Sequence, residues 1–492
     1  MTNYQDPKPQ KISLSEWDKL YDKIPQGVLS KYKYIQEIPK VSKSYVIKMS
    51  EYFRTGDKRL VSLKYDNSLA ALRLWNFLLT EEERLADWRS AGKKLFGVMK
   101  DLGTIPVMVY SSDRCVAFYP DGAWWTPCFK ELEDELFQIA DREGVGEDAC
   151  PVRATLGAFI NQKHFPIPDL CIAGVGSCCN DFSAIMQRIA GLGHKFLWWE
   201  LPYRKDLKSW YRHGDFIKLP NSELCPSSLV SFMVQQLTRI ESGIEEETGE
   251  QVTDEMLSKG IKKANRLRKI VHRLRSLAYG TVPVPAAALE LLICEMIVIH
   301  FCSDSEEAIR VLEHFLETVE KRVKNKQGIL SGNPFRVTWV NPVADLRMMN
   351  LLEELGGCVA GTEYLFSHAL DFIPEDILPM EALAYMVLSD PMIGSAEYRT
   401  RRIIAEAREY KAEGVIISRI PGASHCASES YIIRDIIKKE LDIPVLDISV
   451  PSLIDSTMTS LITRIQAFFE ILDSKRSISH KSRGESYDRM RY

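Results

Sequence analysis

Two cysteines of this chain lie in loops that occupy the same place in the sequence pattern. Cys178 follows the apolar run 169–176 (DLCIAGVG), and Cys426 follows the apolar run 414–420 (GVIISRI). A helical pattern comes after each loop, so each thiol is expected near a helix N-terminus, where the helix dipole favours the thiolate. Thiolates act as nucleophiles and as ligands of soft metals. This recurrence favours a shared chemical role over simple packing, the usual role of a buried cysteine.

Other cysteines are weaker candidates. Cys150, in DACPVRATLGAF, precedes a proline at an expected helix start, which again is a site that the helix dipole favours. Cys179 is adjacent to Cys178 and competes with it for the same role. The remaining cysteines of the eleven are interpreted as packing residues (Cys115, Cys171, Cys294, Cys302 and Cys358) or stay unassigned (Cys128 and Cys225, each beside a proline).

Several common catalytic motifs are missing from the sequence. It has no CxxC pair, HExxH helix, P-loop or GxSxG motif. Gly174 and Gly176 imitate the start of a dinucleotide-binding fingerprint, but Cys179 stands where its third glycine belongs, so a nucleotide site is weakly supported. Widely separated cysteines do not form the local ligand pairs of zinc fingers. Iron–sulfur clusters accept such ligands, so an iron–sulfur site is the favoured metal hypothesis.

The elements that must position these cysteines are parallel strands. Strand, helix and strand patterns over 169–201 and again over 414–450 each predict a βαβ unit, and 229–325 is nearly all helical. The expected fold class is α/β, with two Rossmann-like parallel-sheet lobes that flank a helical middle segment and an N-terminal helical extension. Ligands of such sheets bind beyond the carboxyl ends of the strands, where Cys178 and Cys426 are expected.

The chain divides into five expected parts. They are an N-terminal helical extension over 1–90, a first α/β lobe over 91–228, a helical segment over 229–335, a second α/β lobe over 336–473 and a disordered tail over 474–492. The first 65 or so residues are expected to form short helices as an appendage, and 67–94 is expected to be one helix.

Composition excludes several classes of function. The 492 residues carry a net charge of −4, and the basic residues are scattered, so no nucleic-acid partner is indicated. No apolar run reaches the length needed to span a membrane, and the N-terminus lacks a secretory signal. We therefore expect a cytoplasmic protein with reduced cysteines.

Four segments together resemble the 2-hydroxyacyl-CoA dehydratase and benzoyl-CoA reductase family. They are DACPVRATLGAF at 148–159, PIPD at 166–169, GSC at 176–178 and LPY at 201–203, and GVIISRIPGASHC at 414–426 resembles the third cysteine loop of that family. The chain is most similar to the D-component-like subunits of the dehydratases. It departs from the family pattern at 107–125 and carries a longer N-terminal region.

The resemblance implies a cofactor, partners and a reaction. Cys150, Cys178 and Cys426 would ligate an oxygen-sensitive 4Fe-4S cluster, with Cys179 as the alternative second ligand. The partners would be a smaller homologous subunit, an ATP-dependent iron–sulfur activator protein and an acyl-CoA substrate. The reaction would be dehydration of a 2-hydroxyacyl-CoA thioester through a ketyl radical.

Three alternatives to that reaction remain open. They are reduction of an aromatic acyl-CoA as in benzoyl-CoA reductase, a non-catalytic or double-cubane-type electron-transfer protein, and an iron-free α/β binding protein. Within the family interpretation, His425 could supply a proton or tune a cluster sulfur, or simply face solvent. Arg153 could bind a CoA phosphate or pair with Asp148.

Overall fold

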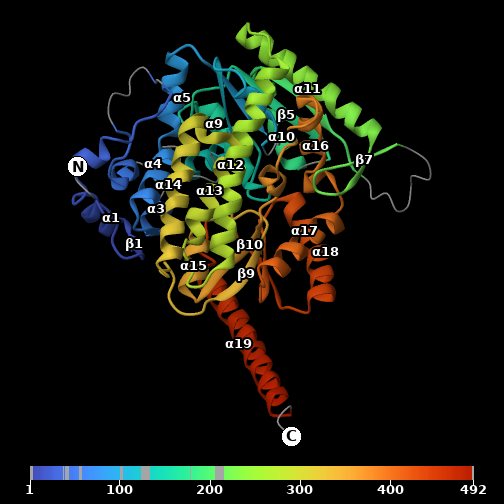
Figure 1. Ribbon diagram of the computed structural model, residues 1–492. Helices are drawn as coiled ribbons and strands as arrows, with labels where there is room; N and C mark the ends of the chain where they lie inside the picture. Colours follow the sequence, from blue (N-terminus) through green and yellow to red (C-terminus); the bar gives the residue numbers. More distant parts are fainter. Residues whose placement is uncertain are drawn as a thin grey trace.

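The computed structural model describes residues 4–36, 38, 44–54, 58–99, 103–122, 133–177, 179–204 and 215–489. It contains two four-stranded parallel sheets, one in each of two lobes, and long helices from the middle of the chain pack against both lobes (Figure 1). This arrangement confirms the predicted α/β class with two Rossmann-like lobes. Among the described residues, no helix is both long and apolar enough to cross a membrane.

The first lobe is built on a parallel sheet with the strand order β4-β3-β5-β6. Its strands are β3 (Lys94–Met99), β4 (Cys115–Phe118), β5 (Leu170–Gly176) and β6 (Phe196–Leu201). Its helices are α6 (Ile105–Val109), α8 (Glu133–Arg142), η2 (Pro151–Arg153), α9 (Ala154–Asn161) and α10 (Asn180–Gly191). The predicted unit β5–α10–β6 is present, with its two strands parallel and adjacent.

The second lobe repeats this plan with the strand order β10-β9-β11-β12. Its strands are β9 (Phe335–Val340), β10 (Gly357–Glu363), β11 (Gly414–Arg419) and β12 (Val445–Ser449). Its helices are α15 (Arg347–Glu354), η4 (Ser367–Leu370), α16 (Pro379–Leu388), η5 (Pro391–Ile393), α17 (Ala396–Glu409), α18 (Ser424–Leu441) and α19 (Met458–Arg489). The second predicted unit, β11–α18–β12, is likewise present.

The shared strand order places the ligand-binding edge of each sheet. In each lobe the first strand, β3 or β9, lies between the second and the third, so the chain reverses its winding direction there. Open α/β sheets bind ligands at this switch point, beyond the carboxyl ends of the strands. The cysteine segments that follow β5 and β11 leave the sheets at these switch points.

Long helices form the middle of the chain and part of its core. They are α11 (Ser227–Thr248), α12 (Asp254–Gly280), α13 (Ala288–His300) and α14 (Ser305–Lys324), with the short turn η3 (Phe301–Ser303) after α13 and the small ribbon of β7 (Phe216–Lys218) and β8 (Leu224–Pro226) before α11. Helix α13 is apolar on nearly all sides, and twelve of its thirteen residues are buried. A helix of this kind needs neighbours all round, which α4, α6, α12 and α15 provide.

The N-terminal region packs into the body of the protein and is not an appendage. It consists of β1 (Lys11–Ser13), α1 (Leu14–Tyr21), α2 (Gln26–Leu29), η1 (Met49–Arg54), α3 (Lys58–Ser62), β2 (Lys64–Asp66), α4 (Leu69–Leu79) and α5 (Glu81–Ser90). Lys11 pairs with Glu353 of α15, Tyr45 donates to Glu307 of α14, and the buried ion pair Asp66–Arg322 ties β2 to α14.

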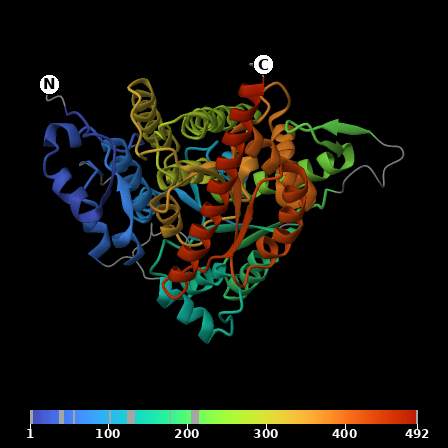
Figure 2. The same cartoon turned by 90° about the horizontal axis from the view of Figure 1, so that it is seen from below.

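Two sequence-based boundaries differ from the structure. The single helix expected over 67–94 is divided at Thr80, whose ψ of 10° is not helical, and strand β3 begins at Lys94. At the other end, α19 continues to Arg489 through most of the segment expected to be disordered, and it projects away from the body (Figures 1 and 2). The polar composition of that segment argues against burial, but it contains no proline and therefore does not oppose a helix.

Candidate functional site

A cavity of about 150 Å³ lies where the two lobes meet the helical middle and the N-terminal region. Its lining is mostly apolar and includes three buried cysteines: Cys150, Cys179 and Cys426. The first two belong to the first lobe and the third belongs to the second lobe. The structure therefore brings together two of the three predicted ligands and the alternative one, whereas Cys178 lies outside the described residues.

Each of the three cysteines stands at the start of a helical segment. Cys150 is the N-cap of η2, with Pro151 as the next residue, and Cys179 is the N-cap of α10. Cys426 was expected in the loop before a helix, but α18 begins at Ser424 and carries Cys426 in its first turn. The N-terminal backbone N–H groups of these segments therefore lie near the thiols.

Two contacts join the cysteine segments of the two lobes. Asp181, in the first turn of α10, accepts hydrogen bonds from the backbone N and from Oγ of Ser424, at 2.8 and 2.9 Å. Gly422 has a φ of +78°, and a Cβ atom there would lie 2.5 Å from the carbonyl oxygen of Ala149. Glycine is therefore required where the loop before α18 crosses the segment that leads to Cys150.

Burial dominates the electrostatics of the three thiols. It raises the pKa of Cys150 well above its usual value, that of Cys179 to about 12 and that of Cys426 to about 11. The backbone N–H groups of Val152 and Phe182 lower the pKa of Cys150 and Cys179, as expected at a helix N-terminus, but burial outweighs this effect.

The three thiols also influence one another. Negative charge on Cys179 or Cys426 further raises the pKa of Cys150, so the thiols lie close enough to repel each other as thiolates. Three thiols this close to one another can all be ionised at once only beside a strong positive charge. A metal centre supplies that charge, and the donor set of three buried cysteines suits an iron–sulfur cluster.

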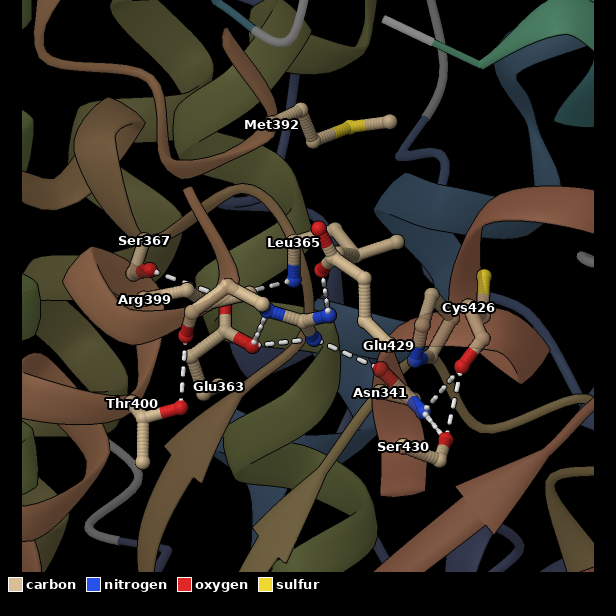
Figure 3. A network of polar contacts seen from close by, with 12 residues as sticks. Asn341, Glu363, Leu365, Ser367, Met392, Arg399, Thr400, Cys426, Glu429 and Ser430 are labelled. Carbon is tan, nitrogen blue, oxygen red and sulfur yellow. Dashed lines mark hydrogen bonds and ion pairs between the residues drawn. The ribbon is translucent and has the colours of Figure 1, made fainter. Parts of the chain in front are cut away.

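A buried polar network contacts the backbone of Cys426 on the side away from its sulfur (Figure 3). Nδ2 of Asn341 donates to the carbonyl oxygens of Cys426 and Ser418, at 3.2 and 2.9 Å, and Oδ1 of Asn341 accepts from Arg399 at 2.6 Å. Arg399, which is fully buried, also pairs with Glu363 and Glu429. The carbonyl of Cys426 faces this network and its sulfur points away from it. Arg399 in addition lowers the pKa of Cys426, against the larger effect of burial.

A second group of polar side chains lines the cavity. Burial raises the pKa of Asp121 to about 7, and its Oδ1 has no hydrogen-bond partner within the part of the chain that the structure describes. Nε2 of His300 lies 3.3 Å from Oε2 of Glu81. Burial acts to lower the pKa of His300, but Cys302 and Glu81 raise it well above its usual value. None of these residues was a candidate from the sequence.

The structure places the other two predicted site residues as follows. His425 lines the cavity, and its Nε2 lies 3.6 Å from Oε2 of Glu429. Arg153 is buried under α8, where it pairs with Asp141 rather than with Asp148 and donates to the carbonyl oxygens of Phe137 and Val145 at 3.2 and 3.0 Å.

The fold and the site define a class of two-lobed α/β proteins with cysteines from both lobes at a shared cavity. The sequence profile of the family described as "2-hydroxyglutaryl-CoA dehydratase, D-component" matches residues 116–472, which is more than half of the chain. The chain belongs to this family, and it is a dehydratase-type protein. Cys150, Cys179, Cys426 and Asp121 lie within the matched region, and Glu81 lies outside it.

One similar protein is YjiM of Escherichia coli (strain K12), which is named as a dehydratase subunit. It is 24% identical over 262 residues, which cover 52% of this chain and 67% of YjiM. This likeness agrees with the family that the profile shows.

Proposed function

We propose that this chain is the iron–sulfur subunit of an oxygen-sensitive 2-hydroxyacyl-CoA dehydratase. The observation that carries the proposal is that three buried cysteines from three separate segments line one cavity. Cys150, Cys426 and one of the pair Cys178 and Cys179 would hold a 4Fe-4S cluster. Cys179 lines the cavity, and Cys178, the choice from the sequence, lies outside the described residues, so both are kept as candidates for the second ligand.

When bound, the cluster would supply low-potential electrons for a ketyl-radical route at the thioester and a Lewis acid for the 2-hydroxyl group. Dehydration removes hydroxide from C2 and a proton from C3, so it is redox-neutral overall and the electron returns. The protein itself must exclude water, orient the thioester and move protons.

Residues of the cavity support these three tasks. Its mostly apolar lining, with Phe182, Met296 and Phe366 among its residues, would exclude water from the reacting atoms. Asp121, whose pKa of about 7 lets it hold or release a proton at neutral pH, is a candidate for proton transfer at C3 or at the leaving hydroxide. His425 remains our second candidate, because it also lines the cavity. For Arg153 we keep the proposed contact with a CoA phosphate, although its guanidinium group already pairs with Asp141.

The partners follow from the chemistry. The reaction needs electrons of lower potential than ordinary cellular reductants supply. We therefore propose a separate iron–sulfur activator that couples electron transfer to ATP hydrolysis. We also propose a smaller homologous subunit, since the family is defined as one component of a dehydratase system. A single chain that dehydrates its substrate with a simple reductant and no ATP would contradict both proposals.

The first experiment measures the cofactor. The chain is purified without oxygen, and its iron and acid-labile sulfide are determined for the wild type and for single serine variants. Cys150→Ser and Cys426→Ser should lose most of the iron, whereas Cys294→Ser, a buried cysteine on α13, should retain it. Comparison of Cys178→Ser with Cys179→Ser then identifies the second ligand. Wild-type protein without iron and sulfide would refute the cluster.

The second experiment measures the reaction. The activated complex is incubated with a series of 2-hydroxyacyl-CoA thioesters and with benzoyl-CoA, and the products are weighed by mass spectrometry. Loss of water from a 2-hydroxyacyl-CoA supports the proposed function. A gain of two hydrogens by benzoyl-CoA would assign ring reduction instead. Turnover of neither substrate, with the cluster intact, would assign an electron-transfer role.

A further inference from the structure

Three metal-ligating groups meet at a place that the proposed cluster does not use. Nε2 of His300, a carboxylate oxygen of Glu81 and Sγ of Cys302 lie within 4.8 Å of one another, and all three residues are buried. Nε2 of His300 is 3.3 Å from Oε2 of Glu81 and 3.7 Å from Sγ of Cys302. We propose that Glu81, His300 and Cys302 bind a divalent transition-metal ion, zinc being the best match, independently of the iron–sulfur cluster.

The distances match the demands of zinc. Typical zinc bonds of about 2.0–2.1 Å to nitrogen and oxygen and about 2.3 Å to sulfur, at tetrahedral angles, separate the nitrogen and oxygen ligands by about 3.4 Å and the nitrogen and sulfur ligands by about 3.6 Å. The two separations that involve Nε2 of His300, 3.3 and 3.7 Å, agree with these values, and the carboxylate oxygen and the sulfur lie within 4.8 Å of each other. Imidazole, carboxylate and thiolate together suit zinc better than the hard cations magnesium and calcium, which prefer oxygen.

The backbone around Cys302 is held in an unfavourable conformation that brings the thiol to His300. Phe301, Cys302 and Ser303 have φ values of 59°, 44° and 56°, a run of left-handed residues without a glycine. Such left-handed residues are energetically unfavourable, so the surrounding structure must hold them in place. Strain of this kind is typical of functional sites.

Helix α5 supplies both a ligand and the residues that hold the strained turn. Glu81 is its first residue. One turn further on, Arg84 donates from Nε and Nη2 to the carbonyl oxygen of Cys302, at 2.9 and 2.7 Å. Trp88 donates from Nε1 to the carbonyl oxygen of Ser303 at 2.8 Å. A single helix thus fixes the turn and the carboxylate relative to each other.

A buried atom without a partner points to a missing ligand. Oε1 of Glu81 is buried and accepts no hydrogen bond from any described residue. Leaving such an acceptor unsatisfied costs free energy, which a metal ion or a metal-bound water would remove. Glu81 and His300 also line the cavity, so a ligand that enters the cavity could complete the coordination of the metal. Three protein ligands with a fourth position open is the pattern of catalytic zinc sites.

Metal analysis of the full-length protein, purified without oxygen, tests this site. Wild type, Cys302→Ser, His300→Gln and the control Cys294→Ser are equilibrated with a zinc buffer, and zinc, iron and sulfide are measured per chain. Wild type and Cys294→Ser should hold about one zinc more than Cys302→Ser and His300→Gln. Any zinc bound by the other cysteines is the same in both serine variants, so the difference reports this site alone.

Cobalt absorption and zinc binding by a Glu81 variant give two further tests of the site. Cobalt in place of zinc should give a thiolate-to-metal absorption band that Cys302→Ser lacks, and Glu81→Gln should weaken zinc binding by about tenfold or more while leaving the fold intact. Equal zinc in Cys302→Ser and Cys294→Ser would overturn the proposal and leave a buried imidazolium–carboxylate pair. Iron and sulfide in the same samples report the cluster separately, so failure of the proposed function would be seen independently.

Discussion

The buried Arg399 network behind Cys426 allows a quantitative prediction. The side chain of Arg399 is 0% exposed and that of Glu363 is 3% exposed, and Nε of Arg399 donates to Oε2 of Glu363 at 2.5 Å. Arg399→Met retains the volume of the side chain but removes its charge. Among the described residues, the carboxylate of Glu363 then keeps only neutral donors, the backbone N of Leu365 and Oγ of Ser367.

The cost of this substitution follows from the burial of the pair. Loss of one partner of a buried ion pair typically lowers the free energy of unfolding by about 3–5 kcal/mol, because the other charge is left without compensation. Arg401→Met is the matched control on the same helix. Arg401 is 47% exposed and pairs with Glu223 at the surface, so its loss should cost about 0–1 kcal/mol.

The assay combines denaturation with iron analysis. Urea unfolding followed by circular dichroism gives the change in the free energy of unfolding. Arg399→Met should also lower the iron content, because Asn341 loses the hydrogen bond that orients it against the carbonyl of Cys426. The double variant with Glu363→Gln should recover at least half of the stability, since no carboxylate is left unpaired at that position. A loss below about 1 kcal/mol for Arg399→Met, or no recovery in the double variant, would refute the reasoning.

Three shorter predictions concern the cavity and the joint between the lobes. Gly422→Ala should cost about 2 kcal/mol or more and reduce the iron content, because φ is +78° and the new Cβ would lie 2.5 Å from the carbonyl oxygen of Ala149; unchanged iron and stability would contradict the close approach. Asp181→Ala should cost about 1 kcal/mol and increase hydrogen exchange at the start of α18, whereas Asp181→Asn, which keeps an acceptor oxygen, should do neither. Asp121 has its pKa raised from 3.8 to about 7, so the native state holds a proton that the unfolded state releases, and stability should fall as pH rises from about 4 to about 7. Asp121→Asn should remove part of that fall, about 2 kcal/mol between pH 5 and pH 7. Parallel urea titrations at pH 5 and pH 7 would measure it, and an unaltered pH dependence would contradict the raised pKa.

The two βαβ units could be predicted because their signals are local. Short apolar runs followed by helical patterns identify β5–α10–β6 and β11–α18–β12 from sequence alone, and the structure confirms both. Strand β3 escaped prediction because its apolar run follows α5 after only a short turn, so it resembles a continuation of the helical pattern. Its place beside β5 depends on sheet pairing, which no local pattern encodes.

The candidate site was predictable only in part, for the same reason. The position of Cys426 after a buried strand and the resemblance at Cys150 pointed to the cavity that the structure contains. The choice between Cys178 and Cys179 turns on a single residue at the start of α10, which is finer than sequence patterns can resolve. Glu81, Asp121 and His300 come from three distant segments, and only the packing of α5 against η3 brings Glu81 to His300.

Under the proposed function, binding of the cluster and contact between the two lobes are coupled. Cys150 and Cys179 belong to the first lobe and Cys426 to the second, so a cluster held by all three thiols would form only when the lobes are held together. Without metal, the joint relies on the hydrogen bonds of Asp181 to Ser424 and on the close approach at Gly422. Because a ligand that needs both lobes stabilises the contact between them, loss of the proposed cluster should weaken that contact before it affects either sheet. Leu78 and Glu81 line the cavity from outside the matched region 116–472, so the family match does not determine that part of the lining.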